Sequence, residues 1–129
     1  ILPNSFNDND TKRIVTAGRE VIETEAAALV RLADLLDDNF CKAVDLILAT
    51  RQRVIVSGMG KSGHVGRKIA ATFASTGTPA YFVHPGEAAH GDLGMITGGD
   101  LLLIMSNSGA TPELKAVIQH AKKLGCAII

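Results

Sequence analysis

The sequence of 129 residues has little of what marks several large protein classes. Aromatic residues make up only 4% of it, with no tryptophan, and 13 basic residues are balanced by 13 acidic ones. A neutral chain of this kind lacks the basic surface that attracts nucleic acids or anionic membranes. Its longest apolar runs have only the length of a strand, too short to cross a bilayer. We therefore expect neither a nucleic-acid nor a membrane partner.

Cysteine is equally scarce. Cys41 and Cys126 are the only two, and neither lies in a CxxC pair or beside a histidine cluster. Isolated cysteines are typical of reduced, buried side chains, which predicts a cytoplasmic protein. Because the chain starts at Ile1 rather than at methionine and stops within an apolar run, we expect the natural protein to extend at both ends.

Small aliphatic residues and glycine are abundant, and they alternate in segments that predict an α/β domain. Helical spacing of apolar residues predicts helices over 11–37 and 40–49, which would pack on a sheet or on a second subunit. Short β-branched runs then alternate with helical stretches: strands at 53–58, 80–83, 101–106 and from 126, and helices at 65–76 and 111–125. This order predicts a doubly wound parallel sheet with helices on both faces, flavodoxin- or Rossmann-like. A single domain over 1–129 would comprise N-terminal helices (1–50) and an α/β core (51–129).

The stretch GMGKSG at 58–63 satisfies the G-x-G-x-x-G pattern and ends like a P-loop. A P-loop needs a glycine where Ile55 stands inside the strand, so that interpretation fails. A dinucleotide site would have an acidic residue at the end of the next strand, where the sequence has His84. We favour a third interpretation: the glycines let the backbone approach a small anionic ligand, and Lys61 and Ser62 project from the turn.

A second loop, SNSGAT at 106–111, predicts the nature of that ligand. Ser106, Ser108 and Thr111 surround one glycine at the start of a helix. Backbone N–H groups and the positive end of the helix dipole point into such a spot, which suits a phosphate monoester. Each hydroxyl taken alone is more typical of a turn or a helix cap. Their combination with the lysine loop favours phosphate.

Candidates for acid–base chemistry gather in the loop HPGEAAHGD at 84–92 and at the start of the last helix. His90 is the first candidate because histidine is the side chain that most often serves as a general acid or base, although a lone histidine is more often an ordinary surface residue. Glu113 is favoured by the helix dipole alone, but it also borders the proposed phosphate. Lysine, histidine and glutamate around a phosphate predict proton transfer on a sugar phosphate. The spacing of His84 and His90 matches no standard zinc site.

Three stretches carry a resemblance to a known family: GMGKSGHVGRKIAATFASTGTPA, FVHPGEAAHGDLGMIT and SNSG. Together they resemble the sugar isomerase (SIS) domain, and more closely the D-arabinose 5-phosphate isomerases. The resemblance covers the chain from residue 51 to its end, and more loosely the N-terminal helices. It implies a cytoplasmic aldose–ketose isomerase that interconverts D-ribulose 5-phosphate and D-arabinose 5-phosphate. The product would feed synthesis of Kdo, the acidic sugar of lipopolysaccharide.

The resemblance also implies roles for individual residues. Lys61, His90 and Glu113 match active-site positions of the family. The binding set, to which we add Ser57 and Ser62 beside the glycine turn, comprises Ser57, Ser62, Gly77, Thr78, His84, His90, Ser106, Ser108 and Thr111. No cofactor is implied, and His84 matches a position where zinc can bind and inhibit. A further pocket glutamate and histidine, and often a pair of CBS domains, would follow Ile129.

The expected chemistry moves a proton between C1 and C2 through a cis-enediol. Lys61 would stabilise the enediolate or help open the chain. His90, Glu113 or the histidine beyond the end would carry the proton. A non-catalytic sugar-phosphate-binding regulatory SIS module is the alternative, and a nicotinamide enzyme a more distant one. SIS domains usually pair, so we expect a homo-oligomer, either a dimer or a tetramer.

Overall fold

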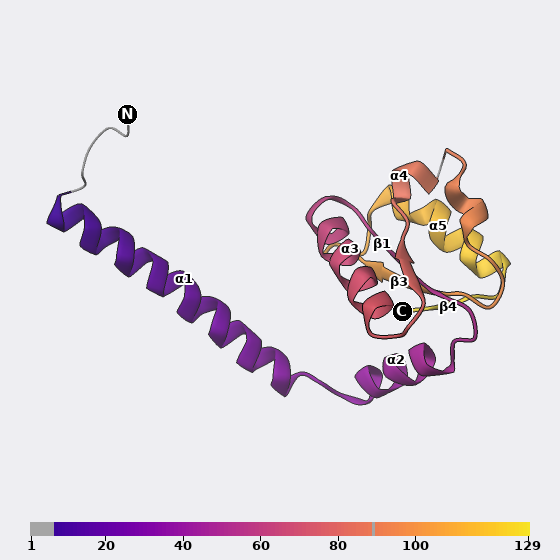
Figure 1. The fold of residues 1–129 in the computed structure, drawn as a ribbon, viewed down its shortest axis with the longest axis horizontal. Coiled ribbons are helices and arrows are strands. Elements are labelled where there is room, and N and C mark those ends of the chain that lie inside the picture. The colour runs from indigo at the N-terminus through magenta and orange to yellow at the C-terminus, as the bar shows by residue number, and fades with distance from the viewer. Residues whose placement is uncertain (1–6, 89) are drawn as a thin grey trace. The chain divides into compact units, whose positions relative to one another are not determined.

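The computed structural model of the chain describes residues 7–88 and 90–129. They divide into two units: residues 7–40 belong to the first, and the described residues of Cys41–Ile129 form the second. In chain order the elements are α1 (Asp8–Asp34), α2 (Asp38–Ala49), β1 (Val54–Gly58), α3 (Gly60–Ser75), β2 (Ala80–Phe82), α4 (Pro85–Ala88), the 3₁₀ helix η1 (Asp92–Met95), β3 (Leu101–Met105), α5 (Pro112–Lys123) and β4 (Ala127–Ile128) (Figure 1). Among the described helices, none combines the length and apolar character needed to span a bilayer.

Helix α1 begins three residues earlier than the sequence predicts, because Asn7 caps it. The Asn7 side chain accepts hydrogen bonds from the backbone N–H groups of Asn9 and Asp10, at 3.0 and 2.9 Å. None of the 27 residues of α1 is buried. Its apolar side chains, such as Ile22 at 67% and Leu29 at 68% exposure, therefore have no partner within the first unit.

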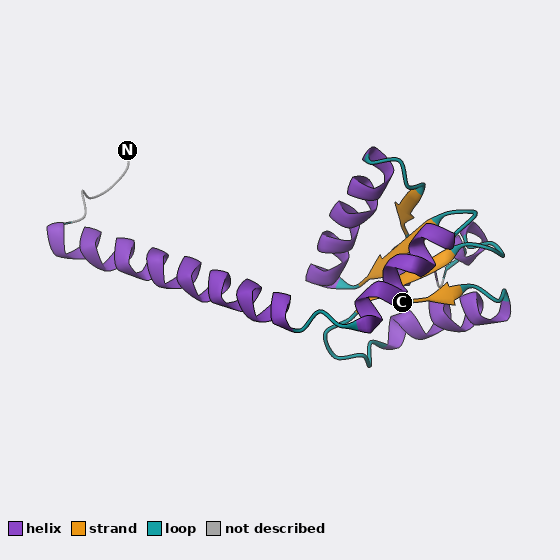
Figure 2. Ribbon diagram, turned by 90° about the horizontal axis from the view of Figure 1, so that it is seen from below, coloured by secondary structure: helices purple, strands orange, loops and turns teal. Residues whose placement is uncertain are grey.

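The sheet has four parallel strands in the order β2-β1-β3-β4 (Figure 2). Val54 of β1 lies opposite Ala80 of β2 and Leu101 of β3, and Leu101 lies opposite Ala127 of β4. After β1 the chain turns to one side to form β2, and then crosses to the other side to form β3. The predicted doubly wound parallel sheet is confirmed, and its topological switch point lies between β1 and β3.

Helices cover both faces of the sheet, so β1 is buried along its whole length. On one face, Ile55 packs with Val117 of α5 and Ala88 of α4. On the other face, Val56 packs with Ala70 of α3 and with Ile47 near the end of α2. The predicted continuous apolar strand is therefore the centre of both halves of the core.

The two cysteines differ from each other. Cys126 is buried in the core beside α5, as the sequence predicts. The prediction for Cys41 is wrong: this residue is exposed on α2, a helix that has no buried residue. A small apolar residue on an amphipathic helix is buried only on the face that meets the core, and composition does not say which face that is.

Candidate functional site

The glycine turn after β1 packs a helix tightly against a strand. A Cβ atom on Gly63 would lie 2.6 Å from the Gly58 carbonyl oxygen, and one on Gly66 would lie 3.1 Å from Cε2 of Phe82. Gly60 has φ of +53°, a left-handed conformation that other residues rarely adopt. These glycines allow α3 to start immediately after β1. The helix therefore begins at Gly60, earlier than residue 65, where the sequence predicts its start.

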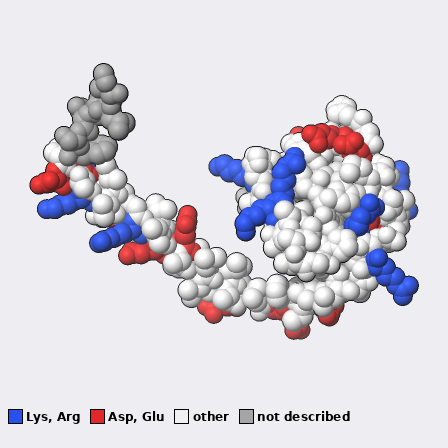
Figure 3. Space-filling model, in the orientation of Figure 1, with Lys and Arg blue, Asp and Glu red and all other residues white. Residues whose placement is uncertain are grey.

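This early start places Lys61 and Ser62 in the first turn of α3, not in a free loop. Backbone N–H groups in the first turn of a helix have no partner within it, and the helix dipole is positive there. The first turn of α3 has no acidic residue, and Lys61 is exposed and forms no ion pair within the described chain. Basic side chains gather over α3 and acidic ones over α4 (Figure 3). The start of α3 is thus suited to an anion.

The SNSGAT loop is folded by its own hydroxyl groups. The Oγ atoms of Ser106 and Thr111 share a hydrogen bond of 3.1 Å. The backbone N–H of Gly109 donates to Ser106 Oγ at 3.1 Å, and that of Ala110 donates to Ser108 Oγ at 3.2 Å. Thr111 is the predicted N-cap of α5, but its side chain makes no capping bond. All three predicted phosphate-binding hydroxyls therefore belong to one loop at a helix start.

The lysine-bearing turn and the hydroxyl loop leave the sheet side by side. Gly58, the last residue of β1, lies opposite Met105, the last residue of β3. A Cβ atom on Gly58 would be only 3.0 Å from the Met105 carbonyl oxygen. The two segments therefore start together at the switch point, where parallel sheets of this type bind ligands.

The segment after β2 forms a separate hollow at the same edge of the sheet. It has a volume of about 520 Å³ and is lined by His84, Gly86, Glu87, His90 and Asp92. The Nδ1 atom of His84 accepts a hydrogen bond of 3.2 Å from the Gly86 N–H, which leaves the Nε2–H group of the neutral imidazole to donate to a ligand. In the part of the chain that the structure describes, no three His, Cys, Asp or Glu side chains are arranged to hold a metal ion. These residues therefore do not make a closed zinc site.

A second hollow of about 420 Å³ lies between the hydroxyl loop and α5. Its lining includes Ser106, Thr111, Lys115 and Lys122. Neither lysine is among the predicted site residues, although helical spacing places both on the face of α5 below Thr111. Lys61 and Glu113 line neither of these two hollows.

Comparison with known proteins identifies the family. Residues 47–129 match the SIS domain model. The chain belongs to the SIS domain family. Over 124 residues, this SIS domain chain is 51% identical to arabinose 5-phosphate isomerase KdsD of Pseudomonas aeruginosa, covering 96% of this chain and 38% of that protein. The identity to KdsD of Escherichia coli K12 is also 51%, over 113 residues, covering 88% of this chain and 34% of that protein.

A solved structure agrees with these relatives. The complex of E. coli CFT073 c3406 with arabinose 5-phosphate superposes with a TM-score of 0.84 at 37% identity, over 95% of this chain and 64% of that one. The chain spans little more than a third of the length of the curated relatives, 38% and 34% of the two named above. The family resemblance carried by the three motifs is confirmed.

Three residues of the predicted binding set, Ser57, Gly77 and Thr78, lie away from the candidate site of the same chain. Ser57 is fully buried, and its hydroxyl donates to the Val83 carbonyl at 2.8 Å, so it braces β1 against the end of β2 rather than facing a ligand. Gly77 and Thr78 follow α3, whose 16 residues carry the chain about 24 Å back along the sheet. They therefore lie at the amino edge of the sheet, opposite Lys61.

Proposed function

We propose that the protein is an aldose–ketose isomerase that interconverts D-ribulose 5-phosphate and D-arabinose 5-phosphate. The observation that carries the proposal is the meeting of the Lys61 helix start with the Ser106–Thr111 loop at the switch point. The 51% identity to curated arabinose 5-phosphate isomerases and the likeness to a structure with arabinose 5-phosphate support it. Synthesis of Kdo in the cytoplasm is the proposed use of the product.

In the proposed mechanism, the phosphate binds at the start of α5, where hydroxyl groups and backbone N–H groups converge. A base removes a proton from C1 of the ketose while the C2 oxygen gains one, which gives a cis-enediol. Loss of the O1 proton and return of a proton to C2 then produce the aldose. His90 or Glu113, or a histidine outside this chain, serves as the base. The Lys61 ammonium group stabilises the developing oxyanion.

This reaction has no net oxidation, and we propose that it needs no cofactor. Zinc would act only as an inhibitor, through His84. His84, Glu87, His90 and Asp92 line one hollow, but because no three of them converge on a single point, the proposed zinc site is weak.

The test of the proposed function is conversion by the intact protein. With D-ribulose 5-phosphate as substrate, ¹³C NMR should show D-arabinose 5-phosphate, and Lys61→Ala should lower kcat by about a hundredfold or more. Lys68→Ala, which removes another exposed lysine of α3, is the matched control and should turn over normally. Binding of the sugar phosphate without conversion would refute the isomerase and favour the regulatory SIS module.

We further propose that the protein is a homo-oligomer, a dimer or a tetramer. Its support is α1, whose 27 residues include large apolar side chains that are more than half exposed. A second copy that covers this stripe would explain why an amphipathic helix of this length is stable. In such an assembly, Gly77 and Thr78 would meet substrate only in the pocket of another copy. Light scattering tests the proposal by measuring the molar mass of the assembly that the intact protein forms. Leu29→Glu should reduce this mass and Glu25→Gln should not. An unchanged mass for Leu29→Glu would refute the proposal.

A further inference from the structure

An ion pair between a partly exposed arginine and a buried aspartate lies at the amino edge of the sheet, away from the candidate site. The Asp100 side chain has no exposed surface, and Arg53 Nη2 donates to its Oδ2 at 3.0 Å. Arg53 Nε and the Arg53 backbone N–H both donate to Oδ1, each at 3.1 Å. Burial alone would raise the pKa of Asp100, but hydrogen bonds from Arg53 and Thr97 outweigh it and the pKa is lowered. The pair is therefore charged at neutral pH and links the start of β1 to the start of β3.

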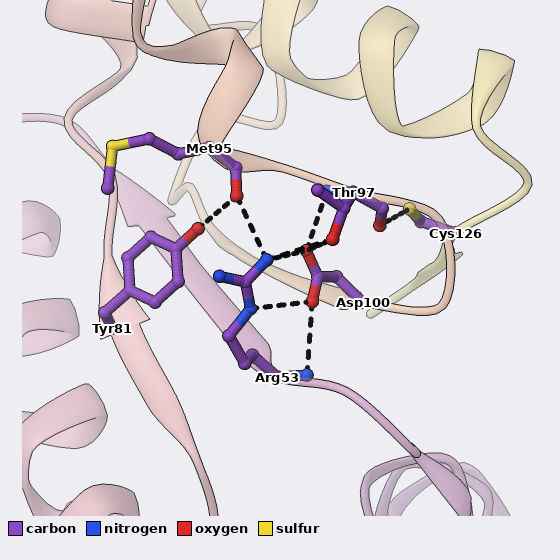
Figure 4. A network of polar contacts seen from close by, with 6 residues as sticks. All are labelled: Arg53, Tyr81, Met95, Thr97, Asp100 and Cys126. Carbon is purple, nitrogen blue, oxygen red and sulfur yellow. Dashed lines mark hydrogen bonds and ion pairs between the residues drawn. The ribbon is translucent and has the colours of Figure 1, made fainter.

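The same pair holds the end of the segment that precedes β3 (Figure 4). Arg53 Nη2 also donates to Thr97 Oγ1 at 2.9 Å and to the Met95 carbonyl at 3.3 Å. The backbone N–H and the hydroxyl of Thr97 donate to Asp100 Oδ2, at 2.7 and 3.0 Å. The Tyr81 hydroxyl, from β2, donates to the Met95 carbonyl as well. Tyr81 of β2 and the residues that immediately precede β1 and β3 thus hold the end of η1.

The segment from His84 to Thr97 is consequently fixed at both ends. At its beginning, the Ser57 hydroxyl holds the Val83 carbonyl, and at its end, Met95 and Thr97 are held by Arg53 and Asp100. Between these points Ala88 and Ile96 are buried in the core under α5. His90 lies in this span, exposed and just before η1. Its backbone N–H donates to the Glu87 carbonyl of α4 at 2.9 Å, so its position depends on α4 on one side and, through Gly91, on η1 on the other.

We propose that Arg53, Tyr81, Thr97 and Asp100 are positioning residues that set the place of His90 at the opposite edge of the sheet. They touch no substrate; they act through η1. This inference rests on the proposed isomerase function and takes His90, one of the three candidates named above, as the base, so that its displacement is read as a loss of proton transfer. A displacement of about 1 Å at a reacting group is enough to slow a reaction severely.

Two variants of the intact protein test the inference without disturbing the core. Thr97→Val keeps the shape of the side chain but removes its hydroxyl, and Tyr81→Phe removes one donor to Met95. Each should lower kcat by roughly tenfold while KM stays within about twofold, because the phosphate loop is not altered. Amide hydrogen exchange should accelerate at 90–97 and remain unchanged at 106–111. Thr97→Ser keeps the hydroxyl that Thr97→Val lacks, so its kcat should be restored to the wild-type value.

Thr72→Val is the matched control, since the Thr72 hydroxyl is exposed and donates only within α3, to the Lys68 carbonyl. Wild-type kcat in Thr97→Val and Tyr81→Phe, accompanied only by a lower Tm, would overturn the inference and leave the four residues a structural role. Failure of Thr97→Ser to restore kcat would overturn it too. If the wild-type protein does not isomerise the sugar phosphate, the proposed function is refuted separately. Unchanged amide exchange at 90–97 in the variants would still refute the claim that these four residues hold η1 in place.

Discussion

Replacement of Gly63 by alanine tests whether the glycine pattern serves helix packing. The new Cβ would lie 2.6 Å from the Gly58 carbonyl oxygen, well inside the 3.4 Å at which ordinary contact begins. The clashing atom belongs to the backbone of a fully buried strand, so it cannot rotate away as a flexible side chain could. The start of α3 must therefore move away from β1.

The cost follows from overpacking a buried contact. Such insertions destabilise a protein by about 1–3 kcal/mol, which for a unit of this size lowers Tm by roughly 5–20 °C. Because the shifted helix carries Lys61, KM for the sugar phosphate should rise as well. Thermal unfolding followed by circular dichroism, with steady-state kinetics on the same samples, measures both effects.

Gly18→Ala is the matched control for this variant. Nothing lies within 4 Å of the Cβ it would add, and Gly18 is inside a helix, where alanine is favoured by about 1 kcal/mol. Its helicity should rise and its kinetics stay as in the wild type. A Gly63→Ala protein with wild-type Tm and KM would refute the assignment of this glycine to close packing.

Three further predictions concern the hydroxyl loop, the ion pair of Arg53 with Asp100, and zinc. Ser106→Ala removes the proposed hydrogen bond to the phosphate. One hydrogen bond to a charged group is worth about 1.5–3 kcal/mol, so KM should rise by about tenfold to a hundredfold with little change in Tm; an unchanged KM in steady-state assays would contradict it. Because the folded-state pKa of Asp100 is lowered from 3.8, its contribution to stability is complete above that pH and is lost as the pH falls below it. Urea titrations should show this acid slope in the wild type and a shallower one in Asp100→Asn, and equal slopes would be the contrary result. Activity should survive EDTA, and zinc should inhibit the wild type but not His84→Ala; loss of activity in EDTA would point to a required metal instead.

The sheet can be predicted from the sequence because its signals are local. The run at 53–58 is apolar and β-branched, as a strand buried on both faces must be, and Pro112 and Gly125 mark the ends of α5. The sequence places the start of α3 too late, because glycine, lysine and serine at 60–63 have the composition of a loop. Only the tight contact between Gly63 and Gly58 shows why they are helical.

The site is predictable only where residues lie close in the chain. Ser106, Ser108 and Thr111 occur within one loop, so their convergence follows from the sequence alone. The pairing of Arg53 with Asp100 spans 47 residues and has no periodic signal, so only the three-dimensional structure reveals it. Gly77 and Thr78 are grouped with the site by resemblance, and the length of α3 separates them from it.

The most direct measurement is the position of the bound phosphate on the intact protein. In ¹⁵N-resolved titrations with arabinose 5-phosphate, the backbone amides of 60–62 and 106–111 should shift first and most, and their shifts should saturate together. Lys61→Ala should weaken the shifts at both segments, because the two begin side by side at Gly58 and Met105. If the amides of other residues shift and saturate while those of 60–62 and 106–111 do not shift, the result would contradict a phosphate site at this junction.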